Sequence, residues 1–136
     1  MPRVVPLLTL AVLLMAASPF GGLPLSPAEA AAAGGRAGLI SFYGAHRAGR
    51  RTASGGRFHP GGFTAAAPSL RFGARMRVTV PATGRSVVVT ITDRMPRRGR
   101  LLDVSVGAAR ALGILRRGVV LAMIRPASRP AIAARH

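Results

Sequence analysis

The chain has 136 residues, a length that suits one domain, and it contains no cysteine, which excludes disulfide bonds and thiolate metal sites. Lysine and arginine together number 20 against 3 acidic residues, and every one of the 20 is an arginine, giving a net charge of +17. This charge predicts weak, sequence-blind attraction to polyanions such as nucleic acid, acidic polysaccharide or anionic lipid surfaces.

The first thirty residues have the pattern of a secretory signal peptide. Arg3 gives a short basic start, the segment from Val4 to Ala17 is almost wholly apolar, and small residues around Ala30 offer a cleavage point. The apolar run is short against the roughly 20 residues that a membrane span requires. We therefore expect cleavage near Ala30 and export to the periplasm or outside the cell, with no transmembrane anchor after cleavage. No cysteine follows the apolar run, so we do not expect a lipoprotein.

The rest of the chain divides by composition into three parts. Residues 31–37 are small and glycine-rich, which predicts a flexible linker. Residues 38–126 carry the periodic patterns of a folded domain, with dense glycine and proline that favour short strands and turns over a helical bundle. Residues 127–136 lack periodicity and predict a disordered tail.

Alternation of apolar and polar residues predicts that this domain is mostly β. Met76, Val78 and Val80 alternate with polar residues, and a turn at 81–85 joins them to a second alternating run, so the two segments predict a hairpin. The full set, in chain order, is a strand at 39–43, strands at 75–80 and 87–92, a strand at 100–104, a helix at 106–112 capped by Ser105 and ended by Gly113, and a strand at 119–124. A small closed barrel buries five or six such strands without leaving long edges.

Seven short segments, in order and with suitable spacing, carry a resemblance to a known family. They are GLISFYG at 38–44, RTASG at 51–55, FTAA at 63–66, LRFGARMRVT at 70–79, GRSVVV at 84–89, TDRMP at 92–96 and GRLLDVS at 99–105. Over roughly residues 38–125, the chain resembles the rare lipoprotein A (RlpA) family.

The resemblance implies both a fold and an activity. The implied fold is a six-stranded double-psi β-barrel with one or two short helices, related to the catalytic domain of expansins, and the chain is expected to be monomeric. The implied activity is that of a peptidoglycan lytic transglycosylase, which cleaves glycan strands without water and leaves 1,6-anhydromuramyl ends. Active members prefer strands stripped of stem peptides at the division septum. No cofactor is expected, and divisome proteins are candidate partners.

The polar positions of the family pattern are only partly kept. Gly56 stands where the family has a glutamate, His59 where it has an aspartate, and Ala67 where it has a histidine. Asp93 of the Asp-Arg-x-Pro motif matches, as does Asp103 of the Asp-Val-Ser segment. The activity is therefore expected to be impaired or to depend on Asp93.

Asp93 is the first candidate catalytic residue. A single carboxyl group can protonate a glycosidic oxygen and then remove the proton of the sugar's own C6 hydroxyl, so one carboxylate suffices for this reaction. Arg94, Arg97 and Arg98 follow it closely in the sequence. A carboxyl group that faces guanidinium groups favours its ionised form, which makes it a poor proton donor. If these arginines point at Asp93, the residue is better suited to act as a base or as electrostatic support.

Two further residues are candidate catalytic groups. His59 can give up a proton at mild pH and falls where the family carries a carboxylate, although a histidine in a glycine-rich loop is also typical of a solvated turn. Asp103 lies just before Ser105 and the helix start, where the alternative role is to order that junction or accept from backbone amides.

Several residues are candidate substrate contacts. Tyr43 is expected to face the groove, where its ring could stack on a sugar, while its neighbour Phe42 faces the core. Thr52 and Ser54 could hydrogen-bond a glycan, and Arg94 is a further candidate contact. The remaining aromatic residues of the domain, Phe58, Phe63 and Phe72, are expected to pack in the barrel.

Two functions from different classes follow. The first is an RlpA-type enzyme that cleaves peptidoglycan through Asp93, and the second is the same barrel acting as a peptidoglycan-binding module without turnover. A specific nucleic-acid binder lacks the aromatic platforms and helix signatures of known readers. A metal site is not expected, since three dispersed histidines and two carboxylates show no ligand spacing.

Overall fold

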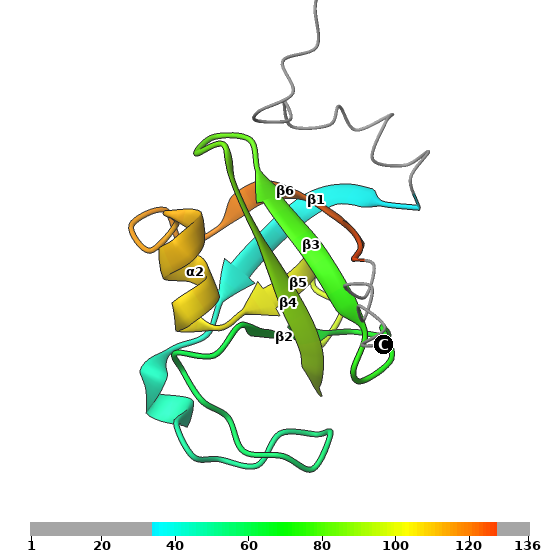
Figure 1. Ribbon diagram of the computed structural model, residues 1–136, viewed down its shortest axis with the longest axis vertical. Helices are drawn as coiled ribbons and strands as arrows, with labels where there is room; N and C mark the ends of the chain where they lie inside the picture. The colour runs from blue at the N-terminus through cyan, green and yellow to red at the C-terminus, as the bar shows by residue number, and fades with distance from the viewer. Residues whose placement is uncertain (1–33, 128–136) are drawn as a thin grey trace, which may run out of the picture.

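The computed structural model describes residues 34–127, which form a β-barrel with a short helix at its side (Figure 1). The elements are β1 (Arg36–Phe42), the 3-10 turn η1 (Ala45–Arg47), β2 (Thr64–Ala67), β3 (Arg75–Val80), β4 (Arg85–Arg94), β5 (Arg100–Val104), α2 (Val106–Leu112) and β6 (Val120–Pro126). Residues 1–33 and 128–136 lie outside the described residues. They comprise the expected signal peptide, the first three residues of the expected linker, and the expected tail apart from Ala127.

The six strands close into a barrel in the order β1, β5, β2, β4, β3, β6. Two neighbouring pairs are parallel, β1 with β5 and β2 with β4, and the other pairs are antiparallel. Closure leaves no strand edge open to pair with another chain. The predicted mostly β fold, a small closed six-stranded barrel with a short helix, is confirmed.

The two-residue period predicted from the sequence sets which side chains fill the barrel. On β3, Met76, Val78 and Val80 are buried while the arginines and the threonine between them are partly exposed. The predicted hairpin of β3 and β4 is present, with Val78 paired to Val87. Burying one apolar face of each strand in a shared core is the main stabilisation available to a domain without disulfides.

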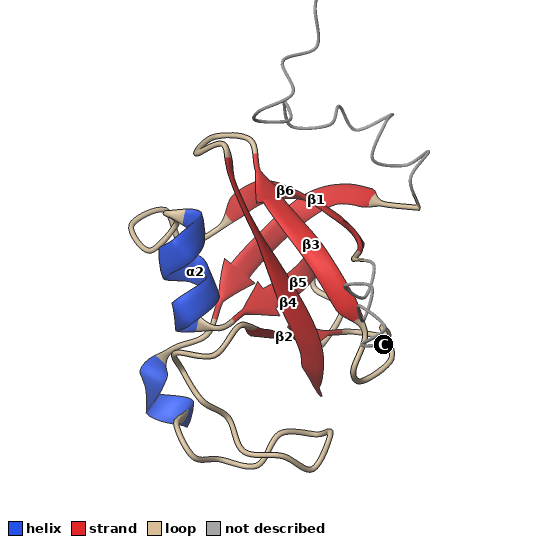
Figure 2. Cartoon of the chain, in the orientation of Figure 1, coloured by secondary structure: helices blue, strands red, loops and turns tan. Residues whose placement is uncertain are grey.

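The helix α2 packs on the barrel as the sequence predicts. The hydroxyl oxygen of Ser105 accepts a hydrogen bond from the backbone N–H of Ala108, and Gly113 ends the helix in the left-handed region with φ of 72°. Its small residues Ala108 and Ala109 join the core together with Leu112. Figure 2 shows α2 beside the strands, with the long loop between β1 and β2 running below it.

Three features differ from the sequence-based expectations. β2 carries no apolar and polar alternation, because three of its four residues are alanines, so its periodicity gave no signal. β1 begins at Arg36, inside the expected linker, because its first residues pair with β6. The expected barrel packing of Phe63 and Phe72 is wrong, since both side chains are exposed. Phe58 is buried, as expected, but lies outside the main core cluster.

Candidate functional site

The strand register brings the two aspartates of the domain to one wall of the barrel. On β2, Ala66 pairs with Asp93 of β4 on one side and with Asp103 of β5 on the other. The neighbours Ala65 and Ala67 belong to the core cluster, so alternation turns Ala66 and its two partners outward. We call the strands β4, β2 and β5 the carboxylate wall.

A β-bulge is what turns Asp93 out of the core. Ile91 is fully buried and pairs with Ala65, whereas the next pair joins Asp93 to Ala66, so Thr92 is an extra residue in β4. Without it, alternation would give Asp93 the same direction as Ile91 and bury the carboxylate in the barrel. Bulges are a common way to re-aim a side chain next to an active site.

Residues 44–63, which we call the cleft loop, are fastened to the wall through Asp93. Its Oδ1 atom accepts hydrogen bonds from the backbone N–H of Ala53 at 3.0 Å and of Arg94 at 2.9 Å. The backbone N–H of Ser54 also donates to the carbonyl of Thr92 at 3.1 Å. One carboxylate oxygen of Asp93 therefore helps to hold the loop, and the hydrogen bonds of the described residues leave the second oxygen available.

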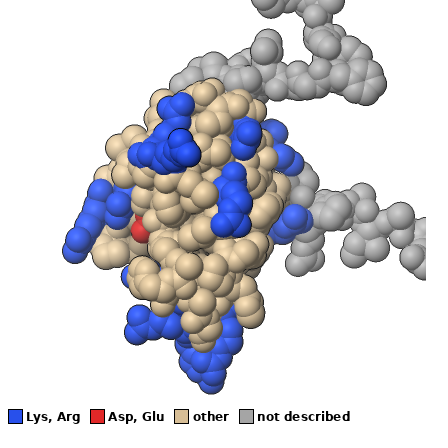
Figure 3. All heavy atoms as spheres, turned by 90° about the vertical axis from the view of Figure 1, so that its left-hand side faces the viewer, with Lys and Arg blue, Asp and Glu red and all other residues tan. Residues whose placement is uncertain are grey.

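A cleft of about 290 Å³ lies between the cleft loop and the wall. It is lined by Asp93, three arginines and two aromatic residues, namely Tyr43, Arg47, Arg50, Arg51, Phe58 and Asp93. Figure 3 shows one face of the molecule, on which arginine side chains are spread over the surface with one small area of acidic surface among them. The cleft thus combines one carboxylate with guanidinium groups that can bind acidic groups of a ligand.

Arg94 and Arg97, two of the three arginines that closely follow Asp93 in the sequence, bond to other groups. Arg94 Nη1 donates to the carbonyl of Leu70 at 2.6 Å, and its guanidinium carbon lies 3.9 Å from the centre of the Phe72 ring. Arg97 Nη2 donates to Ser69 Oγ at 3.2 Å. The stack with Arg94 also gives exposed Phe72 a partner at the surface. Arg94, a predicted substrate contact, is not among the residues that line the cleft.

Asp103 has a different environment from Asp93. It accepts a hydrogen bond from the hydroxyl of Ser41 on β1, and its Oδ1 lies 3.5 Å from Arg100 Nε. This is the one ion pair within 4.0 Å among residues 34–127. Asp103 does not line the cleft. Its hydrogen bond ties β5 to β1 rather than to the helix start, which departs from the expected junction role.

Tyr43 lies in the cleft as expected, but its ring already has partners. The ring is tilted by 44° against that of Phe58, with centroids 4.8 Å apart, and the guanidinium of Arg47 lies 5.8 Å from its centroid. Burial raises the pKa of Tyr43 above its ordinary value of 10.0, and the charges of Asp93 and Asp103 raise it further, while Thr64 and Arg47 lower it in part. Tyr43 therefore keeps its proton at neutral pH.

The hydroxyl of Tyr43 is a candidate ligand contact. It is buried and, within the described part of the chain, no group bonds to it with good hydrogen-bond geometry, although the Thr64 hydroxyl lies close enough to lower the pKa of Tyr43. A buried hydroxyl without a partner costs free energy unless water or a ligand satisfies it. The phenol is thus a neutral donor at the same cleft as Asp93.

The other predicted site residues lie away from the cleft lining. Thr52 is buried and its hydroxyl lies 2.9 Å from that of Ser54, a bond within the cleft loop. His59 is exposed in the loop and does not line the cleft. Ala67 is fully buried in the core. Gly56 has open space beside it, with only Thr52 Oγ1 at 3.8 Å from the position of an added Cβ.

Comparison with protein families identifies the domain. Residues 35–123 match the family described as "Lytic transglycolase", which covers more than half of the chain. The chain belongs to the lytic transglycolase family. The closed barrel with its parallel pairs is accordingly the double-psi β-barrel that the resemblance implied.

Curated relatives agree with this assignment over the same region. The probable endolytic peptidoglycan transglycosylase RlpA of a Nostoc species is 56% identical over 85 residues, which are 60% of this chain and 23% of that protein. The endolytic peptidoglycan transglycosylase RlpA of Neisseria meningitidis serogroup A is 42% identical over 82 residues, 60% of this chain and 34% of that protein. The chain thus matches about a quarter to a third of the length of these relatives.

Solved structures share the fold of this lytic transglycolase domain. The Clavibacter michiganensis expansin has a TM-score of 0.57 at 24% identity, covering 71% of this chain and 52% of that one. A Streptomyces papain inhibitor has a TM-score of 0.56 at 23% identity, covering 67% of this chain and 92% of that one. Identities this low show the barrel fold alone.

The cleft also contains residues that the sequence did not indicate. Arg47, Arg50 and Arg51 line it, and their signal in the sequence was only the density of arginines between residues 47 and 57. Phe58 was expected in the barrel and instead supports Tyr43. Within residues 34–127, no three His, Asp or Glu side chains gather in a way that could hold a metal ion, and no helix is long and apolar enough to cross a membrane.

Proposed function

We propose that this domain binds the glycan strands of peptidoglycan in the Asp93 cleft and cleaves them as a lytic transglycosylase, outside the cytoplasmic membrane. The observation that supports this most directly is the position of Asp93. The bulge at Thr92 turns the carboxylate outward, two backbone N–H groups fix one of its oxygens, and the cleft opens beside it. Family membership and the names of the curated relatives point to the same chemistry.

In the proposed reaction, Asp93 acts first as an acid and then as a base. The carboxyl group donates its proton to the glycosidic oxygen as the bond from that oxygen to C1 of the muramic acid breaks. The C6 hydroxyl of the same sugar then attacks C1, and its proton returns to the Asp93 carboxylate. The product is a 1,6-anhydro ring, and no water is consumed. Arg94 and Arg97 bond to groups other than this carboxylate, although three other arginines, Arg47, Arg50 and Arg51, line the cleft with it.

The other cleft residues take supporting roles in this proposal. Arg47, Arg50 and Arg51 bind acidic groups along the glycan, since peptidoglycan carries carboxylates on its lactyl groups or stem peptides. The neutral phenol of Tyr43 donates a hydrogen bond to a sugar oxygen. Asp103 supports the wall through Ser41 and Arg100 rather than touching the substrate. The domain works as a monomer and without a cofactor, and divisome proteins are its candidate partners.

A second candidate function is peptidoglycan binding without turnover. It is favoured by the cleft's single carboxylate and by Gly56, His59 and Ala67 at the positions where the resembled family carries polar groups. In this case, the arginines and Tyr43 hold the glycan, and Asp93 serves only to fasten the cleft loop.

The two functions are separated by incubating the purified protein with peptidoglycan glycan strands stripped of stem peptides. Mass spectrometry then detects the new chain ends. Cleavage by the proposed reaction gives 1,6-anhydromuramyl ends and no reducing ends. New reducing ends would show hydrolysis and contradict the proposed chemistry. No new ends, together with sedimentation of the protein with intact cell-wall sacculi, would leave the binding function.

A further inference from the structure

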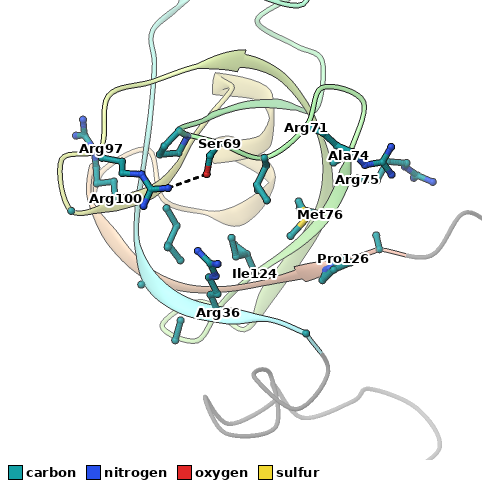
Figure 4. A pocket seen from close by; sticks show the side chains of 18 residues that line it. Arg36, Ser69, Arg71, Ala74, Arg75, Met76, Arg97, Arg100, Ile124 and Pro126 are labelled. Carbon is teal, nitrogen blue, oxygen red and sulfur yellow. Dashed lines mark hydrogen bonds between the residues drawn. The ribbon is translucent and has the colours of Figure 1, made fainter.

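A second, larger cavity lies apart from the cleft, inside the ring of strands at one opening of the barrel (Figure 4). Its volume is about 900 Å³, within the range of cavities that bind small molecules, and none of its lining residues lines the Asp93 cleft. The strand starts of β1, β3 and β5 and the strand end of β6 surround it, together with residues 68–71. We call it the arginine basin.

The floor of the arginine basin is apolar. Met76 and Ile124 rise from the barrel core, and Leu70, Ala74 and Leu101 pack against that core while remaining partly exposed. The lining contains no aromatic residue, and Ser69 is its one hydroxyl-bearing side chain. Such a floor suits a hydrocarbon chain, whereas a sugar needs aromatic faces or many hydrogen-bonding groups.

The rim of the basin is strongly cationic. Five arginines and no acidic residue line it, namely Arg36, Arg71, Arg75, Arg97 and Arg100. Figure 4 shows the Arg36 guanidinium reaching over the floor, and Arg97 bonded to Ser69 across the mouth. Among the described residues, Asp103 is the one carboxylate paired with any of the five, through Arg100. Guanidinium groups gathered over an apolar floor complement an anionic head joined to an apolar chain.

The chain's own flanking segments do not supply the missing charge. Residues 1–33 contain one acidic residue, Glu29, and residues 128–136 contain none but add Arg129 and Arg135. Within the given sequence, these segments therefore hold fewer acidic side chains than the four basin arginines that lack a carboxylate partner in the described domain.

We propose that the arginine basin binds one molecule of an anionic phospholipid. The phosphate lies between Arg36 and Arg97, and an acyl chain lies along the floor formed by Leu70, Met76 and Ile124. This site is separate from glycan binding, so it stands or falls independently of the function of the Asp93 cleft. It gives an exported domain a direct contact with lipid.

The test is calorimetric titration of the full chain with dihexanoyl phosphatidylglycerol at concentrations where the lipid stays monomeric. We expect saturable binding of one lipid per chain, and about tenfold weaker binding by the Arg36→Gln, Arg97→Gln double variant. Arg110→Gln, Arg116→Gln is the matched control, because it removes the same charge from exposed residues outside the basin and leaves binding within about twofold. The thermal unfolding of both variants checks that they are folded.

Two further ligands complete the test. Dihexanoyl phosphatidylcholine, which carries the same chains with a zwitterionic head, should bind several-fold more weakly, and inorganic phosphate should bind more weakly still because it lacks the chains. Absence of saturable lipid binding overturns the proposal and would fit a basin filled by the chain's own flanking residues. Equal weakening by the two double variants also overturns it, because it would show attraction to net charge rather than a site.

Discussion

The carboxylate wall and the cleft loop face each other across the cleft, yet they differ in how they are held. The wall is fixed by strand pairing on both sides of β2 and by fully buried neighbours such as Ala65 and Ile91. The loop contributes no strand to the barrel. It is held to β4 through the Asp93 carboxylate, the Thr92 carbonyl and the Thr90 N–H, which donates to the Phe63 carbonyl, and it is held to the start of α2 by hydrogen bonds to the carbonyls of Pro60 and Gly62. The wall therefore sets where the Asp93 carboxylate lies, and the loop supplies the residues that surround it.

This difference matches two of the three departures from the pattern of the family that the chain resembles, whereas the third, Ala67, lies on the wall itself with its side chain buried in the core. Gly56 and His59 both lie in the cleft loop, where exposed positions tolerate change, while the two aspartates on the wall are kept. The loop also carries three arginines that line the cleft, Arg47, Arg50 and Arg51. Under the proposed function, the wall therefore carries the chemistry and the loop affects which glycan is bound.

The largest expected effect is the loss of turnover caused by the substitution Asp93→Asn. An asparagine oxygen can still accept from the N–H groups of Ala53 and Arg94, so the loop stays in place while proton transfer is lost. We expect the formation of anhydromuramyl ends to fall by about 10²- to 10⁴-fold, as for the loss of a general acid or base. The measurement is the rate of product formation by mass spectrometry.

Asp103→Asn is the matched control for that loss, because it changes the other carboxylate of the wall. Since Asp103 does not line the cleft, we expect this variant to keep most of the turnover. If Asp103→Asn abolished cleavage while Asp93→Asn retained it, the roles given to the two aspartates would be reversed.

The next effect concerns the attachment of the loop to the helix. A Cβ added at Gly107 would lie 2.6 Å from the carbonyl oxygen of Gly61, and both are backbone positions that cannot easily move. Gly107→Ala should therefore lower the free energy of unfolding by about 1–3 kcal/mol, although alanine normally favours a helix. Urea denaturation measures this change.

Gly56→Ala provides the comparison within the loop itself. The added methyl group would contact only Thr52 Oγ1 at 3.8 Å, so we expect a change within about 0.5 kcal/mol. Equal destabilisation by the two substitutions would show that the close approach of the helix to the loop does not govern stability.

A smaller effect is expected from the loop arginines. Replacing Arg50 and Arg51 with glutamine removes two positive charges from the cleft lining and should weaken glycan binding several-fold at low salt. The difference in glycan binding between this variant and the wild type should become smaller as the salt concentration rises to the physiological value. Sedimentation with sacculi across a salt series measures it, with Arg110→Gln, Arg116→Gln as the control that lowers net charge elsewhere. Equal losses in both variants would rule out a specific role for the loop arginines.

The smallest effect is on the alkaline side of the pH scale. The pKa of Tyr43 is raised in the folded protein, mainly by burial, so the unfolded chain loses this proton first as pH rises. Stability should therefore be unaffected by Tyr43 below about pH 10 and decline above it. The chain has one tyrosine and neither cysteine nor lysine, so the ultraviolet absorbance of phenolate reports Tyr43 alone.

In that titration, the midpoint of Tyr43 ionisation in the folded protein should lie above the ordinary tyrosine pKa of 10.0. Tyr43→Phe should flatten the alkaline decline in stability. A midpoint at or below the ordinary value would show that the phenol is solvated and does not lie in a buried cleft.

The sequence predicted most of the barrel because its strands follow simple alternation. β3, β4, β5 and α2 were found from Val and Ile spacing, a serine cap and a terminal glycine, all of which act locally. β2 was not found from its periodicity, because Ala65, Ala66 and Ala67 are specified by neighbours distant in the chain.

The site was harder to predict because it depends on pairing and side-chain direction. The sequence identified Asp93 and Tyr43 as candidates, and both lie in the cleft. It could not show that Arg94 turns to Leu70 and Phe72, nor that the bulge at Thr92 directs Asp93 outward. These outcomes depend on contacts between residues more than twenty positions apart.

The most direct test of the account is a crystal structure of the Asp93→Asn variant with a short oligosaccharide of alternating N-acetylglucosamine and N-acetylmuramic acid. The account predicts that a glycosidic oxygen lies within about 2.6–3.2 Å of the side chain at position 93, between the wall and the cleft loop. An oligosaccharide bound elsewhere, with the substituted side chain out of reach of every glycosidic bond, would contradict it.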